Sequence, residues 1–311
     1  MELGIPYMGS KRKLAEDIIH FIRGQNQSAK YFYDIFWWGG AISFEAINQG
    51  FEKVFYVDLD KGMCNLINQI KQWIPEDWNK RITREEFEIL KEKNDAYSVA
   101  MSLCYSFGNS RKNYAYWVDV EPRKKALHYA VVDEDYTLLR ERWIDRKLEG
   151  KTIEERRLNI RKQNIEGNPL LQRYSEDGLF NLQHLQSLEN IKQLQKIKRL
   201  EALEVINSNY KNLSIYTPVE ETIIYCDPPY RGTGTYKIQQ SAFDYKALDK
   251  RFRELPYQAY MSEENPHKVA LTMTKKRLLA WQGTGAGVFE VLYTNKDGIQ
   301  KRQVTQSNLF E

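Results

Sequence analysis

Short apolar runs that alternate with helical segments near both ends of the chain constrain its fold most strongly. Strand-like residues cover 31–35 and 53–57, and helical apolar spacing covers 13–23, 41–48 and 66–73. Strands that alternate with helices of this length are typical of a parallel α/β sheet. Strand signals return at 203–206, 222–226, 257–261, 268–273 and 288–293. We therefore predict one Rossmann-like, doubly wound sheet that is built from both ends of the chain.

The middle of the chain interrupts this alternation with a helical, charged segment between about 78 and 200. Leucine and isoleucine recur there at every third residue from Leu182 to Leu203. Because a helix turns 100° per residue, this period moves the apolar positions around the helix. It indicates either a helix buried on several sides or a tighter, non-α segment. We predict a discontinuous α/β domain of residues 1–75 and 203–311, with a mostly helical insertion of residues 76–202.

Asp227, Pro228, Pro229 and Tyr230 directly follow the strand expected at 222–226. Ligands of doubly wound sheets bind at the carboxyl ends of the strands. An Asp-Pro pair alone is usually a turn, but two prolines fix the backbone that aims the Pro228 carbonyl. That carbonyl and the Asp227 carboxylate can accept both N–H bonds of an exocyclic amino group, so that its lone pair points to an electrophile. Tyr230 offers a flat face for a base that leaves the double helix.

Two further strand ends carry residues suited to a nucleotide-like ligand. The sequence after 31–35 reads Asp34-Ile35-Phe36-Trp37-Trp38-Gly39-Gly40, and small residues there let the backbone approach a ligand and turn into a helix. Asp58 ends the strand at 53–57, where a carboxylate can bind ribose hydroxyls. Asp60 can instead be the N-cap of the next helix.

In this order, the segments resemble the Dam-like DNA adenine-N6 methyltransferases of bacterial restriction systems and phages, from residue 7 to about residue 293. The resemblance implies site-specific methyl transfer from S-adenosylmethionine to adenine N6 in double-stranded DNA, with base flipping. It implies that the α/β domain binds the cofactor and that the insertion recognises the target. It places the catalytic residues at Asp227, Pro228, Pro229 and Tyr230. The cofactor-binding residues that it implies are Tyr7, Lys11, Asp34, Phe36, Gly39, Gly40, Asp58, Asn209 and Asp227.

The chain departs from the family pattern at two positions. Trp38 stands where the pattern has glycine, and Asn209 stands where relatives often have aspartate. An indole at position 38 could fill the methionine pocket, or it could point to solvent. Two alternatives therefore stay open: a non-catalytic DNA-binding or nucleoside-binding relative that has lost the cofactor, and a methyltransferase that acts on RNA adenine or a protein amide.

A local basic excess in the insertion indicates where DNA would bind. Between Arg111 and Leu200 there are 19 Lys and Arg against 14 Asp and Glu, in a chain of net charge +4. Such an excess is typical of a segment that contacts phosphates, although a solvated helical surface can produce it too. A polar loop at 106–114, similar to one in phage relatives, opens the insertion. The predicted DNA-binding residues are Asn109, Arg111, Lys112, Tyr114, Arg123, Lys124 and Lys125.

Other features of the sequence exclude several classes of protein. The three cysteines are far apart and lack the spacing of zinc ligands, which indicates a reducing compartment without disulfides. No apolar run approaches the ~20 residues of a membrane span. Methyl transfer from a sulfonium needs no metal. We therefore expect a cytoplasmic, bacterial or phage-encoded enzyme that uses neither a metal nor a membrane. A cognate restriction endonuclease would fit this interpretation but is not required by it.

Overall fold

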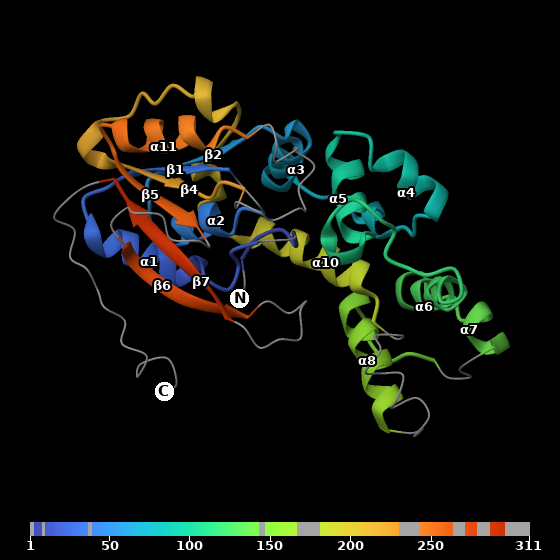
Figure 1. Ribbon diagram of the computed structural model, residues 1–311. Coiled ribbons are helices and arrows are strands. Elements are labelled where there is room, and N and C mark those ends of the chain that lie inside the picture. The colour runs from blue at the N-terminus through green and yellow to red at the C-terminus, as the bar shows by residue number, and fades with distance from the viewer. Residues whose placement is uncertain are drawn as a thin grey trace. The chain divides into compact units, whose positions relative to one another are not determined.

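The computed structural model describes residues 3–7, 10–36, 39–142, 147–166, 181–229, 243–263, 271–278 and 287–295. For residues 142, 161–166, 271–278 and 287–291 it describes the backbone alone. The chain forms two compact units. The first contains Met1–Leu3, Lys11–Cys64 and Ile197–Glu311, and the second contains Gly4–Ser10 and Asn65–Lys196. Figure 1 shows the sheet of the first unit and the helices of the second.

In the part of the chain that the structure describes, the first unit forms a seven-stranded sheet in the order β3-β2-β1-β4-β5-β7-β6. The strands are β1 (Tyr31–Ile35), β2 (Lys53–Asp58), β3 (Leu203–Asn207), β4 (Thr222–Cys226), β5 (Gln258–Glu263), β6 (Leu271–Leu278) and β7 (Gly287–Thr294). The strands from β3 to β5 in this order are parallel, and β7 runs antiparallel to β5 and β6. The order reverses direction at β1, which confirms the predicted doubly wound, Rossmann-like fold class.

The carboxyl ends of three strands meet at the centre of this sheet. In the register of the parallel strands, Ile35 of β1 is level with Val57 of β2 and Cys226 of β4. Because successive side chains point to opposite faces, Ile35 and its neighbour Asp34 lie on opposite faces of the sheet. A central parallel strand is covered on both faces, and four of the five β1 residues are buried. Asp34 is thus a carboxyl group within the buried part of the sheet.

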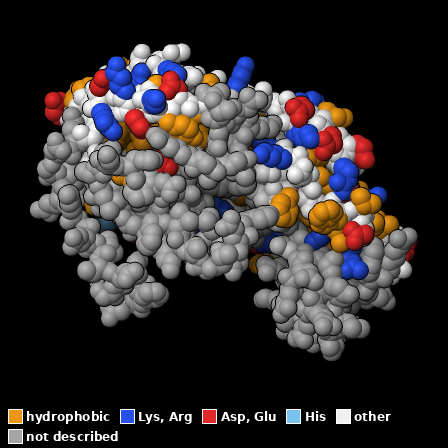
Figure 2. All heavy atoms as spheres, in the orientation of Figure 1, with side chains coloured by type: hydrophobic (Ala, Val, Ile, Leu, Met, Phe, Trp, Pro, Cys, Tyr) orange, Lys and Arg blue, Asp and Glu red, His pale blue; other side chains and the backbone are white. Residues whose placement is uncertain are grey.

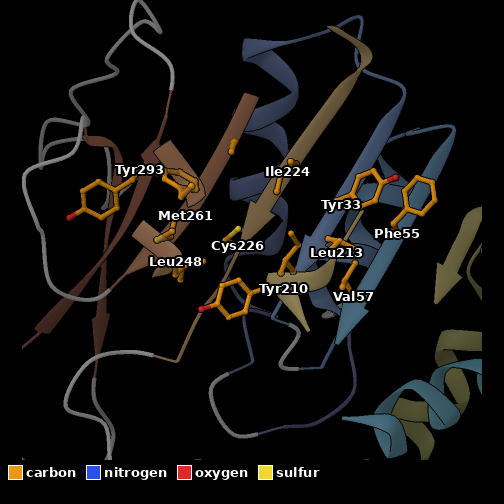
Figure 3. Packing of buried hydrophobic residues seen from close by; sticks show 13 residues of the cluster. Tyr33, Phe55, Val57, Tyr210, Leu213, Ile224, Cys226, Leu248, Met261 and Tyr293 are labelled. Carbon is orange, nitrogen blue, oxygen red and sulfur yellow. The ribbon is translucent and has the colours of Figure 1, made fainter. Parts of the chain in front are cut away.

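One face of the sheet packs against α11 (Tyr245–Glu254), whose Leu248 and Phe252 join the core below β1 and β4. Tyr33 and Phe55 lie side by side in this core (Figure 3), and their stacked rings have centroids 4.1 Å apart. The helices α1 (Ala15–Gln25) and α2 (Ala41–Asn48) lie together on the other face (Figure 1). This arrangement leaves the carboxyl ends of β1, β2 and β4 as the place where loops can build a site.

The second unit is helical, and its residues Asn65–Lys196 follow β2 in the chain. Its helices are α4 (Arg84–Leu90), α5 (Ala96–Cys104), α6 (Glu121–Val132), α7 (Thr137–Arg142), α8 (Ile153–Glu166) and α10 (Gln183–Gln193), and α3 (Lys61–Gln72) leads into it from the first unit. Leu127 of α6, Ile160 of α8 and Leu185 of α10 share one buried apolar cluster. In the described residues, we find no helix with the length and apolar character that crossing a membrane would require.

The repeat of every third residue corresponds to two kinds of helix in succession. α10 ends at Gln193, and short 3₁₀ turns follow at Leu194–Lys196 and Leu200–Ala202. A 3₁₀ helix has three residues per turn, so it keeps positions with this period on one face. In α10 itself the buried residues His184, Leu185, Ser187, Leu188 and Ile191 fall on one broad face of the helix. Of the two alternatives that the sequence left open, the tighter, non-α segment is therefore the one observed, in the turns after Gln193.

Most predicted element boundaries are close to the observed ones, and two differ. The predicted ranges 41–48 and 222–226 coincide with α2 and β4. The strand expected at 268–273 is instead β6, Leu271–Leu278, because its hydrogen-bonded pairing with β7 continues through a run of basic residues. The helix expected from residue 66 begins earlier, at Lys61, because Asp60 caps its first turn.

Candidate active site

Asp227, Pro228 and Pro229 lie at the carboxyl end of β4, and all three are buried. The Asp227 N–H donates to the Ile35 carbonyl oxygen at 3.1 Å, which joins this segment to the end of β1. Proline fixes φ and restricts the residue before it, so the backbone after Asp227 has little freedom. Tyr230, the fourth predicted catalytic residue, lies outside the described residues.

An ion pair joins Asp227 to the segment before α1. Lys11 Nζ lies 3.1 Å from Asp227 Oδ1, and both side chains are 5% exposed. Burial opposes a charged carboxylate, whereas an ammonium at this distance favours it. Lys11 therefore helps to keep Asp227 in the ionised form, which accepts hydrogen bonds and donates none. Lys11 is also a predicted cofactor-binding residue, and a lysine has three N–H donors, with which it can contact Asp227 and a carboxylate of the cofactor.

A second carboxyl group is buried at the end of β1. Asp34 is 2% exposed, and its Oδ2 accepts a hydrogen bond from the Ser43 hydroxyl of α2 at 2.7 Å. Burial raises the pKa of Asp34 to about 7; the Ser43 hydrogen bond opposes this rise, and the charge of Asp227 adds to it. Sequence reasoning missed Ser43, since a hydroxyl in the first turn of a helix is a weak signal. The site thus contains two buried carboxyl groups in different electrostatic surroundings.

The turn from β1 into α2 has a backbone that favours glycine. Gly39 has a φ of 128° and Gly40 a φ of 69°, both in the region that side chains disfavour. α2 begins after Gly40 with neither a side-chain cap nor an acidic residue in its first turn, so its N–H groups can face an anionic group of a ligand. Phe36 also has a positive φ, 69°, which marks a strained turn. Trp37 and Trp38 lie outside the described residues, so the orientation of the Trp38 indole stays a prediction.

The two aspartates at the end of β2 and just after it make different contacts. Asp60 Oδ1 accepts hydrogen bonds from the N–H groups of Gly62 at 2.8 Å and Met63 at 3.2 Å, so Asp60 caps α3. Asp58 is half-buried, and its Oδ1 accepts the Asp60 N–H at 2.6 Å. Leu59 between them is 54% exposed. Because Asp60 serves as the helix cap, the ribose-binding role stays a prediction for Asp58. Leu59 is an exposed apolar side chain next to it.

Asn207 at the end of β3 holds this turn in place. Its Nδ2 donates to the carbonyl oxygens of Asp58 at 3.0 Å and Leu59 at 3.1 Å. The Ser208 N–H also donates to the Asp58 carbonyl, at 2.9 Å. Sequence reasoning missed this role of Asn207; its signal is an asparagine at the end of the strand that pairs with β2.

Aromatic side chains gather beside the carboxyl end of β1. The ring centroid of Phe36 lies 4.9 Å from that of Tyr210 and 5.6 Å from that of Phe243. Asn209, a predicted cofactor residue, caps the turn that carries Tyr210, because its Oδ1 accepts the Lys211 N–H at 2.9 Å. A cavity of ≈ 20 Å³ lies beside these rings, against apolar side chains of α11. This volume holds about one water molecule.

Three of the seven predicted DNA-binding side chains are buried within the second unit. The Nε of Arg111 donates to a serine hydroxyl at 3.0 Å, the Tyr114 hydroxyl to a backbone carbonyl at 3.1 Å, and Lys124 Nζ to another at 2.7 Å. Burial also lowers the pKa of Lys124 to about 8. These groups hold the loop and α6 in place and are buried away from solvent. A basic composition alone does not distinguish such groups from exposed ones.

The other predicted DNA-binding residues reach the surface to different extents. Asn109, Lys112 and Arg123 are half-buried, and Lys125 is exposed. Asn109 donates to the Leu103 carbonyl at 3.0 Å. Trp117 and Val118, between the loop and α6, are 78% and 75% exposed. Figure 2 shows apolar side chains standing among charged ones on the face of the second unit that it presents.

Comparison with known families identifies the chain. A model described as D12 class N6 adenine-specific DNA methyltransferase matches residues 7–283, which is most of the sequence. The chain belongs to this family. It is an adenine-specific DNA methyltransferase that uses S-adenosylmethionine, as the sequence analysis predicts. No curated protein matches the chain.

The residues at the strand ends fit the cofactor of this family. S-adenosylmethionine carries a sulfonium, an ammonium, a carboxylate and a ribose. The buried carboxyl groups of Asp34 and Asp227 suit the cations, Lys11 and the N-terminus of α2 suit the carboxylate, and Asp58 suits the ribose hydroxyls. Tyr7 belongs to the second unit, where its carbonyl accepts the Ser10 N–H at 3.1 Å. Among the described residues, no group of three or more His, Cys, Asp or Glu could hold a metal ion.

Proposed function

We propose that this methyltransferase modifies adenine in one specific sequence of double-stranded DNA and flips the target base into the site at the end of β4. One observation carries the proposal: Asp227 is buried beside two prolines at a strand end, and Lys11 pairs with its carboxylate at 3.1 Å. Such a site lies too deep for a base that is still stacked in a duplex. The first unit would then bind the cofactor, and the second would select the sequence.

In this proposal, Asp227 and the Pro228 carbonyl accept the two N–H bonds of the adenine amino group. S-adenosylmethionine supplies an electrophilic methyl group. The two acceptors direct the N6 lone pair towards that methyl. As the new N–C bond forms, the methyl–sulfur bond would break with its electron pair returning to sulfur, which leaves a neutral thioether, and one N6 proton would pass through Asp227 to solvent. Lys11 keeps Asp227 charged and in place. Tyr230 stacks on the flipped base, in keeping with the resemblance that implies its role.

The proposal is tested with tritiated S-adenosylmethionine and unmethylated duplex DNA. We expect the label on N6-methyl-2′-deoxyadenosine after digestion to nucleosides. Sequencing of the methylated DNA should place the modified adenine within one recognition sequence. 2-Aminopurine in place of the mapped target should gain fluorescence on binding, because flipping removes base stacking. Label at adenines in every context, or label in RNA alone, would contradict the proposal.

Asp58→Asn is expected to weaken the binding of S-adenosylmethionine by about 10-fold to 100-fold. A hydrogen bond to a charged group contributes about 1.5–3 kcal/mol, and the amide lacks that charge. Isothermal titration calorimetry measures the effect. The matched control is Asp60→Asn two residues away, which should leave cofactor affinity within about threefold, since Asp60 caps α3. Equal losses in both variants would remove Asp58 from the ribose site.

We propose that the exposed part of the insertion between Lys112 and Lys125 contacts DNA. Lys112, Arg123 and Lys125 offer cations to phosphates, while Trp117 and Val118 offer exposed apolar groups. Exposed aromatic and aliphatic side chains can insert between bases or stack on them. The buried cations of the same segment fix the shape of this surface.

Charge reversal at Lys112, Arg123 and Lys125 is expected to weaken DNA binding by at least about tenfold at low salt. Each lost phosphate contact should reduce the log–log salt slope by about 0.9. Fluorescence anisotropy between about 50 and 200 mM salt measures both quantities. The control reverses the charge of three exposed cations of α11, Lys246, Lys250 and Arg253. It should leave both the DNA affinity and the salt slope close to those of wild type. An equal effect of the two triple variants would indicate a general charge effect rather than a binding surface.

A further inference from the structure

The charge balance around Asp34 and Asp227 has a consequence for cofactor binding. Asp227 lies 3.1 Å from the Lys11 ammonium, so these two charges compensate each other. Asp34 is a further carboxyl group, 2% exposed, whose hydrogen bond at 2.7 Å comes from the neutral hydroxyl of Ser43. An ionised Asp34 would therefore add a negative charge to a buried and already balanced cluster. Such a charge is costly unless a cation joins it.

Among the residues that the structure describes, the other polar groups around Asp34 do not supply that cation. The groups on the elements packed around it are Tyr56 of β2, Tyr225 and Cys226 of β4, Asp227 after β4, Ser43 and Glu45 of α2, and Lys11 before α1. Burial raises the pKa of Tyr56 and of Cys226, so both are neutral near pH 7. The Tyr225 hydroxyl bonds to Ser262 at 2.5 Å. Glu45 accepts from Asn48 and Gln49 towards the far end of α2.

The substrate form of the cofactor brings one net positive charge, from a sulfonium and an ammonium against one carboxylate. The product, S-adenosylhomocysteine, has lost the sulfonium and is neutral overall. We propose that Asp34 is protonated in the cofactor-free enzyme and ionises when S-adenosylmethionine binds, so that binding of the substrate form releases a proton and binding of the product does not. Asp34 then acts as a counter-charge that favours substrate over product.

This inference rests on the proposed cofactor site and predicts how the affinity for S-adenosylmethionine changes with pH. The pKa of Asp34 is raised to about 7, so the group changes its protonation near neutral pH. If the bound state requires the ionised carboxyl, the affinity for S-adenosylmethionine should rise about tenfold from pH 6 to pH 8. The affinity for S-adenosylhomocysteine should change less than about twofold. After each methyl transfer, Asp34 takes up a proton again and the product is held less tightly.

The experiment is calorimetric titration of the full chain with each ligand, in buffers of different ionisation enthalpy. The dependence of the measured heat on buffer enthalpy gives the number of protons released. At pH 7 we expect about half a proton for S-adenosylmethionine and close to none for S-adenosylhomocysteine. Asp34→Asn should abolish the proton release that comes from Asp34. Any release from the ligand's own ammonium persists in this variant and can be subtracted from the wild-type value. Equal release by wild type and Asp34→Asn, or by both ligands, would overturn the inference.

A second variant keeps the test decisive if Asp34→Asn folds poorly. Ser43→Ala removes a hydrogen bond that favours the ionised carboxylate, so the pH dependence of S-adenosylmethionine binding should move to higher pH. An unchanged midpoint in Ser43→Ala would contradict the proposed role of Asp34. Absence of S-adenosylmethionine binding at every pH would instead contradict the proposed cofactor site. The two failures are therefore distinguishable.

Discussion

Methyl transfer by Asp227→Asn is expected to be slower than wild type by a factor on the order of 10² or more. The carboxylate accepts an N–H of the target amino group in the proposed mechanism, and an amide is a weaker, uncharged acceptor. Affinity for S-adenosylmethionine should fall far less than the rate. Single-turnover transfer of tritium to DNA measures the rate, and calorimetry measures the affinity. Wild-type turnover by this variant would exclude Asp227 from the chemistry.

The ion pair with Lys11 makes a control for folding necessary. Removal of one partner leaves a buried charge, which typically costs about 3–5 kcal/mol. We therefore expect Asp227→Asn to be less stable than the double variant with Lys11→Met, which removes both charges. The double variant should regain stability in urea unfolding but should not regain activity. Recovery of activity together with stability would mean that the single variant lost its fold rather than its catalytic group.

Local sequence patterns were enough to predict the strands and the strand ends at which the candidate site forms. β4 and α2 coincide with their predicted ranges because a buried apolar run before Asp-Pro-Pro and a helix after paired glycines are local signals. The bounds of β6 were harder to predict, because its basic residues are typical of a surface loop and only the pairing with β7 shows that they continue the strand. Pairing of distant segments thus decides what local propensity leaves open.

The candidate site shows the same division between local and distant information. Asp60 and Asp58 could be separated only by the direction in which the Asp60 carboxylate points, towards the first turn of α3. Asn207 reaches the turn after β2 from a strand that follows the whole insertion in the chain. The polar loop at 106–114 predicted Arg111 as a DNA contact, whereas its Nε donates to Ser102 within the unit. Composition records the kind of group but not the partner that the fold brings to it.

Two buried histidines link the stability of the second unit to pH. His128 Nδ1 and His184 Nε2 lie 2.9 Å apart, the other ring nitrogen of His184 bonds to the Tyr116 hydroxyl, and both histidines are at most 2% exposed. Burial lowers the pKa of His128 to about 3 and that of His184 well below its usual value. The charges of Arg81 and Lys124 act in the same direction. Both rings are therefore neutral in the folded unit.

The sign of the resulting pH dependence follows from these lowered pKa values. Above the pKa of an unfolded histidine, about 6.5, folding changes no protonation at these sites. Below it, the unfolded chain takes up protons that the folded unit excludes, so stability is lost as the pH falls towards about 3. Each histidine should cost about 2 kcal/mol between pH 7 and pH 5, which is about 4 kcal/mol for the pair.

Urea unfolding followed by circular dichroism at pH 5, 6 and 7 is expected to reveal this loss in wild type, and His128→Gln should reduce it by about half. The exposed His20 of α1 provides the control, since His20→Gln should leave the pH dependence unchanged. α6 carries His128 together with Arg123 and Lys125, so acid that destabilises this helix should weaken DNA binding. Affinity for DNA should therefore decline below pH 6 in wild type and decline less in His128→Gln. If both variants followed the wild type, the buried histidines would not control acid stability.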